Sequence, residues 1–306
     1  MRVLSALFFG FALLVLAACS GEPADDFMVK DSPYFNASDA LITIDGLPIR
    51  YRDEGAKGAP TIVMIHGFTS SLETWDGVAD ILKGDYRIIR LDLPGHGLTG
   101  PDAQARYSNA DTVRFVSDFL DALDIQNPTL VGNSLGGLVA WRLAQSRPDG
   151  VAKLVLISPG GFSINGVTET PVAVPLMVKL YLTKAPEAGV RQATAALYGD
   201  PSKLSETRLR TIMDMMERPG NGDAFVTRAE TFTLPDPNHD LKTVATPTLI
   251  LWGDKDIMVP PAHGEKFAAT MPNAALTPLD GMGHVPQEEA PELTANLIHQ
   301  FIQQQE

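Results

Sequence analysis

The stretch Leu130-Val131-Gly132-Asn133-Ser134-Leu135-Gly136-Gly137 sets one serine between small residues, where an apolar run gives way to a helical pattern. A tight turn from a strand into a helix strains the backbone of its central residue, and glycines on both sides let the neighbouring chain pass closely. The following helix directs its free N–H groups and the positive end of its dipole toward the same point. The stretch therefore predicts an activated nucleophile at Ser134.

Compact apolar runs alternate with helical patterns on both sides of this turn. Two short alternating runs flank the hairpin signal Asp45-Gly46, and further runs of the fully buried type cover residues 61–65, 87–91, 129–131, 153–157 and 248–251, with a weaker one at 275–279. Helical patterns cover residues 72–82, 111–123, 135–145, 261–269 and 291–303. We expect an α/β fold: an eight-stranded, mostly parallel, doubly wound sheet with functional residues at the carboxyl ends of its strands.

Residues 162–240 interrupt this alternation with helical and irregular segments that contain no convincing parallel strand. We interpret them as an inserted helical lid. The lid is rich in large flexible apolar side chains, which form its own core for the most part and otherwise line an acyl or aromatic pocket. They are Leu176, Met177, Leu180, Tyr181, Met213, Met215, Met216, Phe225 and Phe232.

A nucleophilic serine needs a base, and the base needs a carboxylate that orients it. Acids follow the run at 248–251 in Gly253-Asp254-Lys255-Asp256, and a glycine-rich loop after the last strand carries His284. Two further loops, His66-Gly67-Phe68 and Asp92-Leu93-Pro94-Gly95-His96-Gly97, follow earlier strands. These motifs, in this order over residues 41–303, make the chain resemble the α/β-hydrolases.

The resemblance implies the triad Ser134, Asp256 and His284, with Asp256 rather than Asp254 as the acid, and an oxyanion hole formed by the backbone N–H groups of Phe68 and Leu135. Asp254 is then a turn residue. The other histidines receive structural roles: His66 and His96 shape or anchor their loops, and His239 and His263 lie in exposed segments. We expect the three tryptophans, Trp75, Trp141 and Trp252, in the core or in contact with the lid.

The composition and motifs of the chain argue against several classes of partner and cofactor. The chain has 306 residues and a formal net charge of -13, which argues against nucleic acid or an anionic lipid surface as the main partner. No histidine or carboxylate pair has metal-ligand spacing, and no dinucleotide fingerprint is present. We therefore expect no metal and no cofactor.

The N-terminus has the features of an export signal. Met1-Arg2 precedes an apolar run from residue 3 to residue 18, which is short for a membrane span, and Leu16-Ala17-Ala18-Cys19 resembles the lipobox of bacterial lipoproteins. Cys19 is the only cysteine in the chain, so lipid attachment explains it where a disulfide within the chain does not. The alternatives are an ordinary signal peptide with an incidental cysteine and an uncleaved anchor helix.

Together these patterns predict a signal peptide at 1–18, a tether at 19–38, core segments at 39–161 and 241–306, and the lid between them. The predicted location is a bacterial membrane, with Ser20 favouring the periplasmic face of the outer membrane by analogy. Oligomeric state stays open.

The leading functional hypothesis is hydrolysis of carboxylic esters, lipid-like or of medium acyl length, through an acyl-enzyme. The second is a carbon–carbon hydrolase of meta-cleavage products, since those enzymes carry similar Gly-Asn-Ser-Met-Gly-Gly and Pro-Gly-Gly motifs. They usually have tryptophan after the histidine, whereas this chain has Val285. The third is a binding or sensor protein with a silent site, which a complete triad disfavours.

Overall fold

The computed structural model describes residues 29–304, and the chain divides into two compact units. The first unit ends at Phe35; its described part contains two turns, in which the N–H of Ser32 donates to Val29 and that of Phe35 donates to Ser32. The second unit begins at Asn36 and holds the strands and helices considered below. Cys19 and the predicted export signal lie outside the described residues.

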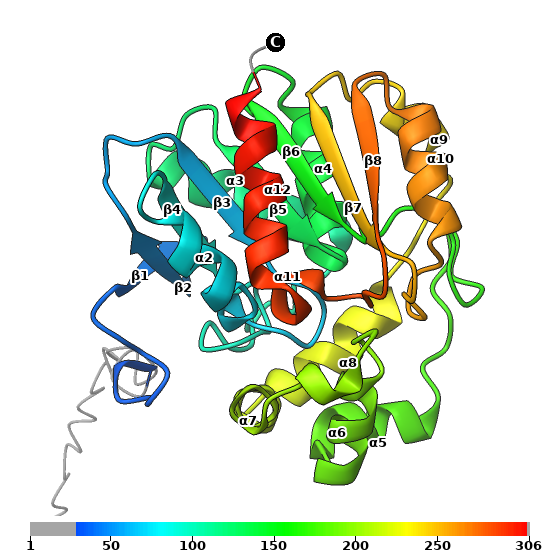
Figure 1. Cartoon of the computed structure of the whole chain (residues 1–306). Helices are drawn as coiled ribbons and strands as arrows, with labels where there is room; N and C mark the ends of the chain where they lie inside the picture. Colours follow the sequence, from blue (N-terminus) through cyan, green and yellow to red (C-terminus); the bar gives the residue numbers. More distant parts are fainter. Residues whose placement is uncertain (1–28, 305–306) are drawn as a thin grey trace, which may run out of the picture. The chain divides into compact units, whose positions relative to one another are not determined.

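The second unit is built on one eight-stranded sheet of order β1-β2-β4-β3-β5-β6-β7-β8 (Figure 1). The pairings of β2 with β1 and with β4 are antiparallel, and the other five are parallel. This confirms the mostly parallel sheet predicted from the sequence. The strands are β1 (Asp39–Ile44), β2 (Leu47–Glu54), β3 (Thr61–Ile65), β4 (Arg87–Leu91), β5 (Thr129–Asn133), β6 (Lys153–Ile157), β7 (Thr248–Gly253) and β8 (Ala274–Leu279).

The central strands are apolar along their whole length because both faces of the sheet are covered by helices. Successive side chains of β5 illustrate this: Leu130 belongs to one core cluster, with Trp141 and Phe267, whereas Val131 belongs to the opposite cluster, with Val78. All five of these side chains are almost completely buried. Successive side chains of a strand point to opposite faces of the sheet. A continuous apolar run therefore needs helices on both faces, which gives the doubly wound arrangement.

The helices of the core begin and end close to the predicted positions. Two differences are clear: over residues 72–82 a 3₁₀ turn, η1 (Leu72–Trp75), precedes a shorter α-helix, and the short helix α11 forms where no helix is predicted. Among the described residues, none of the helices combines the length and apolar character needed to cross a membrane. The core helices are α2 (Asp76–Leu82), α3 (Asn109–Ala122), α4 (Leu135–Ser146), α10 (Ala262–Thr270), α11 (Pro286–Glu289) and α12 (Pro291–Gln303).

The segment between β6 and β7 is helical and forms a cap beyond the carboxyl ends of the strands (Figure 1). It contains α5 (Leu176–Lys184), α6 (Glu187–Ala195), η2 (Pro201–Lys203), α7 (Glu206–Glu217), α8 (Asn221–Thr231) and α9 (Asn238–Leu241). The cap has its own apolar core, which includes Met213, Met216 and Phe225 as expected. Leu176 and Met177 are different, because they are 70% and 73% exposed on α5.

Candidate functional site

Ser134 lies at the junction of β5 and α4 with φ 54° and ψ -114°, a strained conformation for a residue with a side chain. The turn is tight because glycines flank it, as predicted. A Cβ on Gly132 would lie 2.3 Å from the carbonyl oxygen of Gly136, and one on Gly136 would lie 2.1 Å from that of Ile65. Both approaches are far below van der Waals contact, so only glycine fits either position.

The two predicted oxyanion donors flank this serine. A Cβ built on Gly67, the residue before Phe68, would lie 3.3 Å from the Cβ of Ser134, so the loop after β3 runs directly against the nucleophile turn. Leu135 is the first residue of α4, where the helix itself offers no acceptor for the backbone N–H. An oxyanion formed at Ser134 would meet the positive end of the α4 dipole.

His284 and Asp256 are in contact, as the triad order requires. The Nδ1 atom of His284 lies 2.8 Å from Oδ2 of Asp256, and the other carboxylate oxygen accepts the backbone N–H groups of Met258 and Val259 at 2.9 Å each. Both triad candidates are buried, at 6% and 5% exposed. Asp254 instead accepts the N–H of Gly281 at 2.7 Å, which is the turn role expected for it.

The environment of Asp256 favours the ionised carboxylate. Burial alone would raise its pKa, but the hydrogen bonds from His284 and from the Val259 N–H hold the pKa below its ordinary value. An ionised acceptor fixes the imidazole proton on Nδ1. The Nε2 atom of His284 is then the basic nitrogen, as proton abstraction from a serine requires.

Asn133 joins the serine turn to the histidine loop, a role that the sequence analysis missed. Its Nδ2 donates to the carbonyl of His284 at 3.0 Å and to that of Ile157 at 3.2 Å. Because Asn133 directly precedes Ser134, its side-chain hydrogen bond links the candidate nucleophile turn to the backbone of His284. The sequence signal for this role is an asparagine directly before the glycine-flanked serine.

His66 and His96 are fully buried near the base of the cap. The Nδ1 of His66 lies 2.7 Å from the carbonyl of Gly67, and its Nε2 accepts the N–H of Leu93, so the ring holds two loops together as predicted. Burial lowers the pKa of His66 to about 4 and that of His96 well below its ordinary value. Both rings are therefore neutral near pH 7. His96 packs against Phe225 of α8 at 4.9 Å between ring centroids.

The prediction for His263 is wrong. This side chain is 7% exposed, because it lies on α10 with its ring 5.6 Å from that of Phe162, and helix packing covers it. His239 is exposed, as predicted. The three tryptophans are buried in the core, each no more than 2% exposed.

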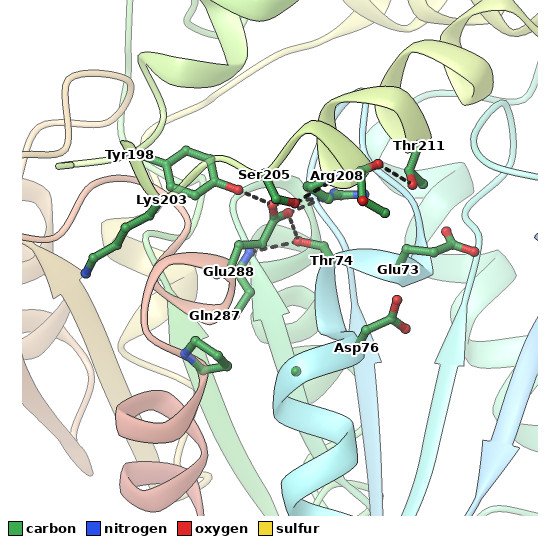
Figure 2. A pocket seen from close by; sticks show the side chains of 13 residues that line it. Glu73, Thr74, Asp76, Tyr198, Lys203, Ser205, Arg208, Thr211, Gln287 and Glu288 are labelled. Atoms are coloured by element: carbon green, nitrogen blue, oxygen red, sulfur yellow. Dashed lines mark hydrogen bonds and ion pairs between the residues drawn. The ribbon is translucent and has the colours of Figure 1, made fainter. Parts of the chain in front are cut away.

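A polar cavity of about 260 Å³ lies between cap helix α7 and the core near η1 and α11. Figure 2 shows Glu288 at its centre, in contact with Arg208, Tyr198 and Thr74. Burial alone would raise the pKa of Glu288, but the charge of Arg208 and three hydrogen bonds lower it. The buried ion pair therefore fastens the cap to the core.

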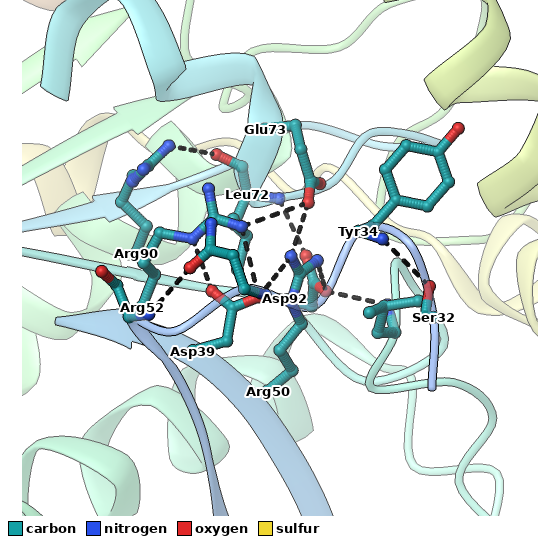
Figure 3. A network of polar contacts seen from close by, with 12 residues as sticks. Ser32, Tyr34, Asp39, Arg50, Arg52, Leu72, Glu73, Arg90 and Asp92 are labelled. Atoms are coloured by element: carbon teal, nitrogen blue, oxygen red, sulfur yellow. Dashed lines mark hydrogen bonds and ion pairs between the residues drawn. The ribbon is translucent and has the colours of Figure 1, made fainter. Parts of the chain in front are cut away.

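A second buried network supports the loop that begins at Asp92. Figure 3 shows Arg50 among three acids, Asp39, Glu73 and Asp92. The Asp92 carboxylate also accepts the N–H groups of Leu72 and Leu98, although burial raises its pKa to about 6. This network is structural, since it ties β2 to η1 and to the loop after β4.

Within residues 29–304, no three histidine, cysteine or acidic side chains gather in a way that could hold a metal ion. The candidate site consists of the Ser134 turn, its two backbone donors and the His284–Asp256 pair. These residues follow the carboxyl ends of four strands, β3, β5, β7 and β8, where α/β proteins hold their ligands.

A family model described as the alpha/beta hydrolase fold matches residues 60–291. The chain belongs to this family. An uncharacterized hydrolase, YugF, from Bacillus subtilis (strain 168) is 30% identical over 271 residues, which is 85% of this chain and 96% of that protein. The family match at residues 60–291 includes the whole cap of this chain and parts of both core segments.

Two further relatives differ in activity. The first, 2-hydroxy-6-oxononadienedioate/2-hydroxy-6-oxononatrienedioate hydrolase 2 from Pseudomonas putida, is 30% identical over 84% of this chain and 92% of its own. The second is a solved structure of a membrane phospholipase A, described as a bacterial virulence factor. It superposes with a TM-score of 0.74 at 25% identity, covering 87% of this chain and 85% of its own.

Proposed function

We propose that this hydrolase cleaves carboxylic esters through an acyl-enzyme on Ser134. The observation that carries the proposal is the strained, glycine-flanked serine turn combined with the 2.8 Å contact between His284 and Asp256. A strained, half-buried serine, an oriented imidazole and a buried carboxylate are the parts that acyl transfer to serine needs.

In the proposed reaction the Ser134 hydroxyl attacks the ester carbonyl while Nε2 of His284 takes its proton. The backbone N–H groups of Phe68 and Leu135 stabilise the negative oxygen of the tetrahedral intermediate. The imidazolium then protonates the departing alkoxide, leaving the acyl group on Ser134. A water molecule repeats the sequence and releases the acid.

The proposed substrate carries an apolar acyl group. Phe68, 36% exposed beside the serine turn, stacks edge to face with Phe225 of the cap at 5.6 Å, so an aromatic wall stands next to the nucleophile. Long or medium acyl chains suit such a wall better than charged acids do. The likeness to a structure of a membrane phospholipase A supports this choice of substrate class.

We further propose that the enzyme works at a membrane surface in an extracytoplasmic compartment, attached through Cys19. The lipobox-like sequence at 16–19 supports this. So does helix α5, where Leu176, Met177 and Leu180 are exposed. Residues 170–186 contain no acidic residue and two lysines, in a chain with a net charge of -13. An acid-free apolar surface of this kind is compatible with contact to lipid.

The second candidate is hydrolysis of a carbon–carbon bond in meta-cleavage products. The 30% identity to a hydrolase named for such a substrate favours it, as does the similarity of the serine turn to the Gly-Asn-Ser-Met-Gly-Gly motif of those enzymes. Against it stands Val285, which is buried and apolar at the position where the tryptophan of those enzymes follows the histidine. Ester hydrolysis therefore remains the first proposal.

Labelling with a fluorophosphonate probe, followed by a panel of p-nitrophenyl and glyceryl esters and a chromogenic dienoate, tests these alternatives. We expect labelling and acid release with the wild type, and loss of both by several orders of magnitude in Ser134→Ala. Turnover of the dienoate alone would favour the second candidate. A folded wild type that neither reacts with the probe nor turns over any substrate would support the silent binding protein and end both enzyme proposals.

A further inference from the structure

A loop of the cap lies directly against the loop that carries His284. The cap loop, residues 197–200, connects α6 to η2, and the histidine loop, residues 280–285, connects β8 to α11. The backbone N–H of His284 donates to the carbonyl of Leu197 at 2.6 Å. The candidate base is therefore bonded through its own main chain to the cap and not only to the core.

Glu289 joins the same two loops through its side chain. Its Oε2 atom accepts the N–H of Gly199 at 3.0 Å and that of Gly283 at 2.9 Å, and its Oε1 atom accepts the N–H of Asp200 at 2.9 Å. The carboxylate is 5% exposed. One side chain thus accepts three backbone N–H groups, two from the cap loop and one from the histidine loop.

Steric contact makes this junction rigid. A Cβ on Gly283 would lie 2.2 Å from the carbonyl oxygen of Leu197, and a Cβ on Gly199 would lie 2.1 Å from that of Gly281. The two loops touch backbone to backbone, with no side chain between them that could absorb a shift. A displacement of the cap loop would therefore move Gly283, the residue next to His284.

We propose that Glu289 is a positioning residue, which holds the imidazole of His284 in line through Gly283 and couples its alignment to the seated cap. The inference rests on the proposed function, in which His284 is the base. It predicts that catalysis requires the cap loop in the position described here. Misplacing a base by about 1 Å costs about 10²-fold in rate even when the base itself is intact.

Glu288 provides a matched control. It is the adjacent residue and also fastens the cap, through Arg208 at 2.8 Å and Tyr198 at 2.6 Å, but its core partner is Thr74 on η1. Its backbone N–H donates to Val285, as that of Glu289 also does, but within residues 29–304 its side chain makes no hydrogen bond to the histidine loop. Removing either carboxylate weakens the attachment of the cap, but only Glu289 also bonds the backbone N–H of Gly283, the residue next to His284.

The test compares Glu289→Gln with Glu288→Gln in the full chain. Each glutamine keeps the shape of the side chain, but in E289Q the amide nitrogen must face a backbone donor, so at least one of the three bonds is lost. Three quantities are measured: kcat and KM on a soluble p-nitrophenyl ester, the thermal midpoint, and the downfield ¹H resonance of the His284 Nδ1 proton that Asp256 accepts.

We expect E289Q to lower kcat by about 10- to 100-fold with KM changed less than about threefold, and to shift or broaden the His284 resonance. E288Q is expected to lower the thermal midpoint while kcat stays within about threefold and the resonance stays in place. If E289Q does not fold, E289D keeps the charge but shortens the reach, and the same two changes are expected in milder form.

An unchanged resonance and kcat in a folded E289Q would overturn the proposal. So would equal losses of kcat in both variants with an unmoved resonance, since that result would assign the effect to cap stability alone. Failure of the proposed function has a different signature, because the wild type would then hydrolyse no ester. The resonance would still report whether Glu289 positions His284.

Discussion

The Nδ1 atom of His284 lies 2.8 Å from a carboxylate oxygen of Asp256, whose second oxygen is fully engaged by the backbone of Met258 and Val259. The carboxylate cannot rotate without giving up two hydrogen bonds, so it holds the imidazole in one orientation. This geometry makes Asp256, and not the nearby Asp254, the residue that orients the candidate base His284.

Replacing Asp256 by asparagine should lower kcat for ester hydrolysis by roughly 10⁴-fold with little loss of folded structure. The asparagine NH₂ would favour the tautomer with the proton on Nε2, which cannot accept the serine proton. Steady-state kinetics with a p-nitrophenyl ester measure the effect. Asp254→Asn is the control, because Asp254 bonds only the exposed turn at Gly281, and its kcat should stay within about twofold.

The serine turn should be intolerant of a single added methyl group. Gly136→Ala would place a Cβ 2.1 Å from the carbonyl oxygen of Ile65, inside the central sheet. We expect a loss of about 3 kcal/mol or more in the free energy of unfolding, because the clash is with backbone on a buried strand. Gly84→Ala is the matched control, since no atom lies within 4 Å of its Cβ position; its change should be below about 0.5 kcal/mol. Urea denaturation compares the two, and equal midpoints would refute the steric argument.

Much of this site is predictable from the sequence because its parts are local. Ser134 is marked by glycines within two positions, Asp256 follows an apolar run of the buried-strand type, and His284 lies in a glycine-rich loop after a weaker run. The mostly parallel sheet is predictable for the same reason, since compact apolar runs alternate with helical patterns along the chain.

The remaining parts depend on contacts between distant segments. Glu289 lies in an ordinary acidic stretch, and its partner Gly199 is 90 residues away in a cap that shows no strand or motif to fix its placement. Asn133 is similar, because its partner is a carbonyl 151 residues away. The prediction for His263 is wrong because its helix pattern does not reveal that Phe162, at the start of the predicted lid, packs against it.

Acid should destabilise the fold through His66. Its pKa falls from an ordinary 6.5 to about 4 because it is buried. The unfolded chain therefore binds a proton more readily than the folded one between these values, so the contribution of the neutral ring is complete above pH 6.5 and is lost as pH falls toward 4. The loss amounts to about 3 kcal/mol at pH 4.

The buried Asp92 acts in the opposite direction, since its raised pKa of about 6 makes its protonation favour the folded state as pH falls from 6 toward 3.8. The effect of His66 is therefore measured as the difference in the pH dependence of stability between the wild type and a His66 variant. Urea midpoints at pH 7.5, 6 and 5 should fall less steeply in His66→Gln than in the wild type, because glutamine keeps an acceptor for the Leu93 N–H but does not titrate. Parallel curves would exclude His66 as the source.

The exposed apolar face of α5 should matter only when the ester is presented in a lipid surface. Leu176 and Met177 are 70% and 73% exposed, and burying one such side chain contributes about 1.5–3 kcal/mol. The double change Leu176→Ser with Met177→Ser should lower hydrolysis of a long-chain ester in phosphatidylcholine vesicles by about tenfold or more. Hydrolysis of a soluble short-chain ester should stay within about twofold of the wild-type rate.

Ile81→Ser and Leu293→Ser, on α2 and α12, are the controls, as both residues are exposed apolar side chains outside the cap. Equal losses in the double variant and in these controls would show that the α5 face has no special relation to lipid.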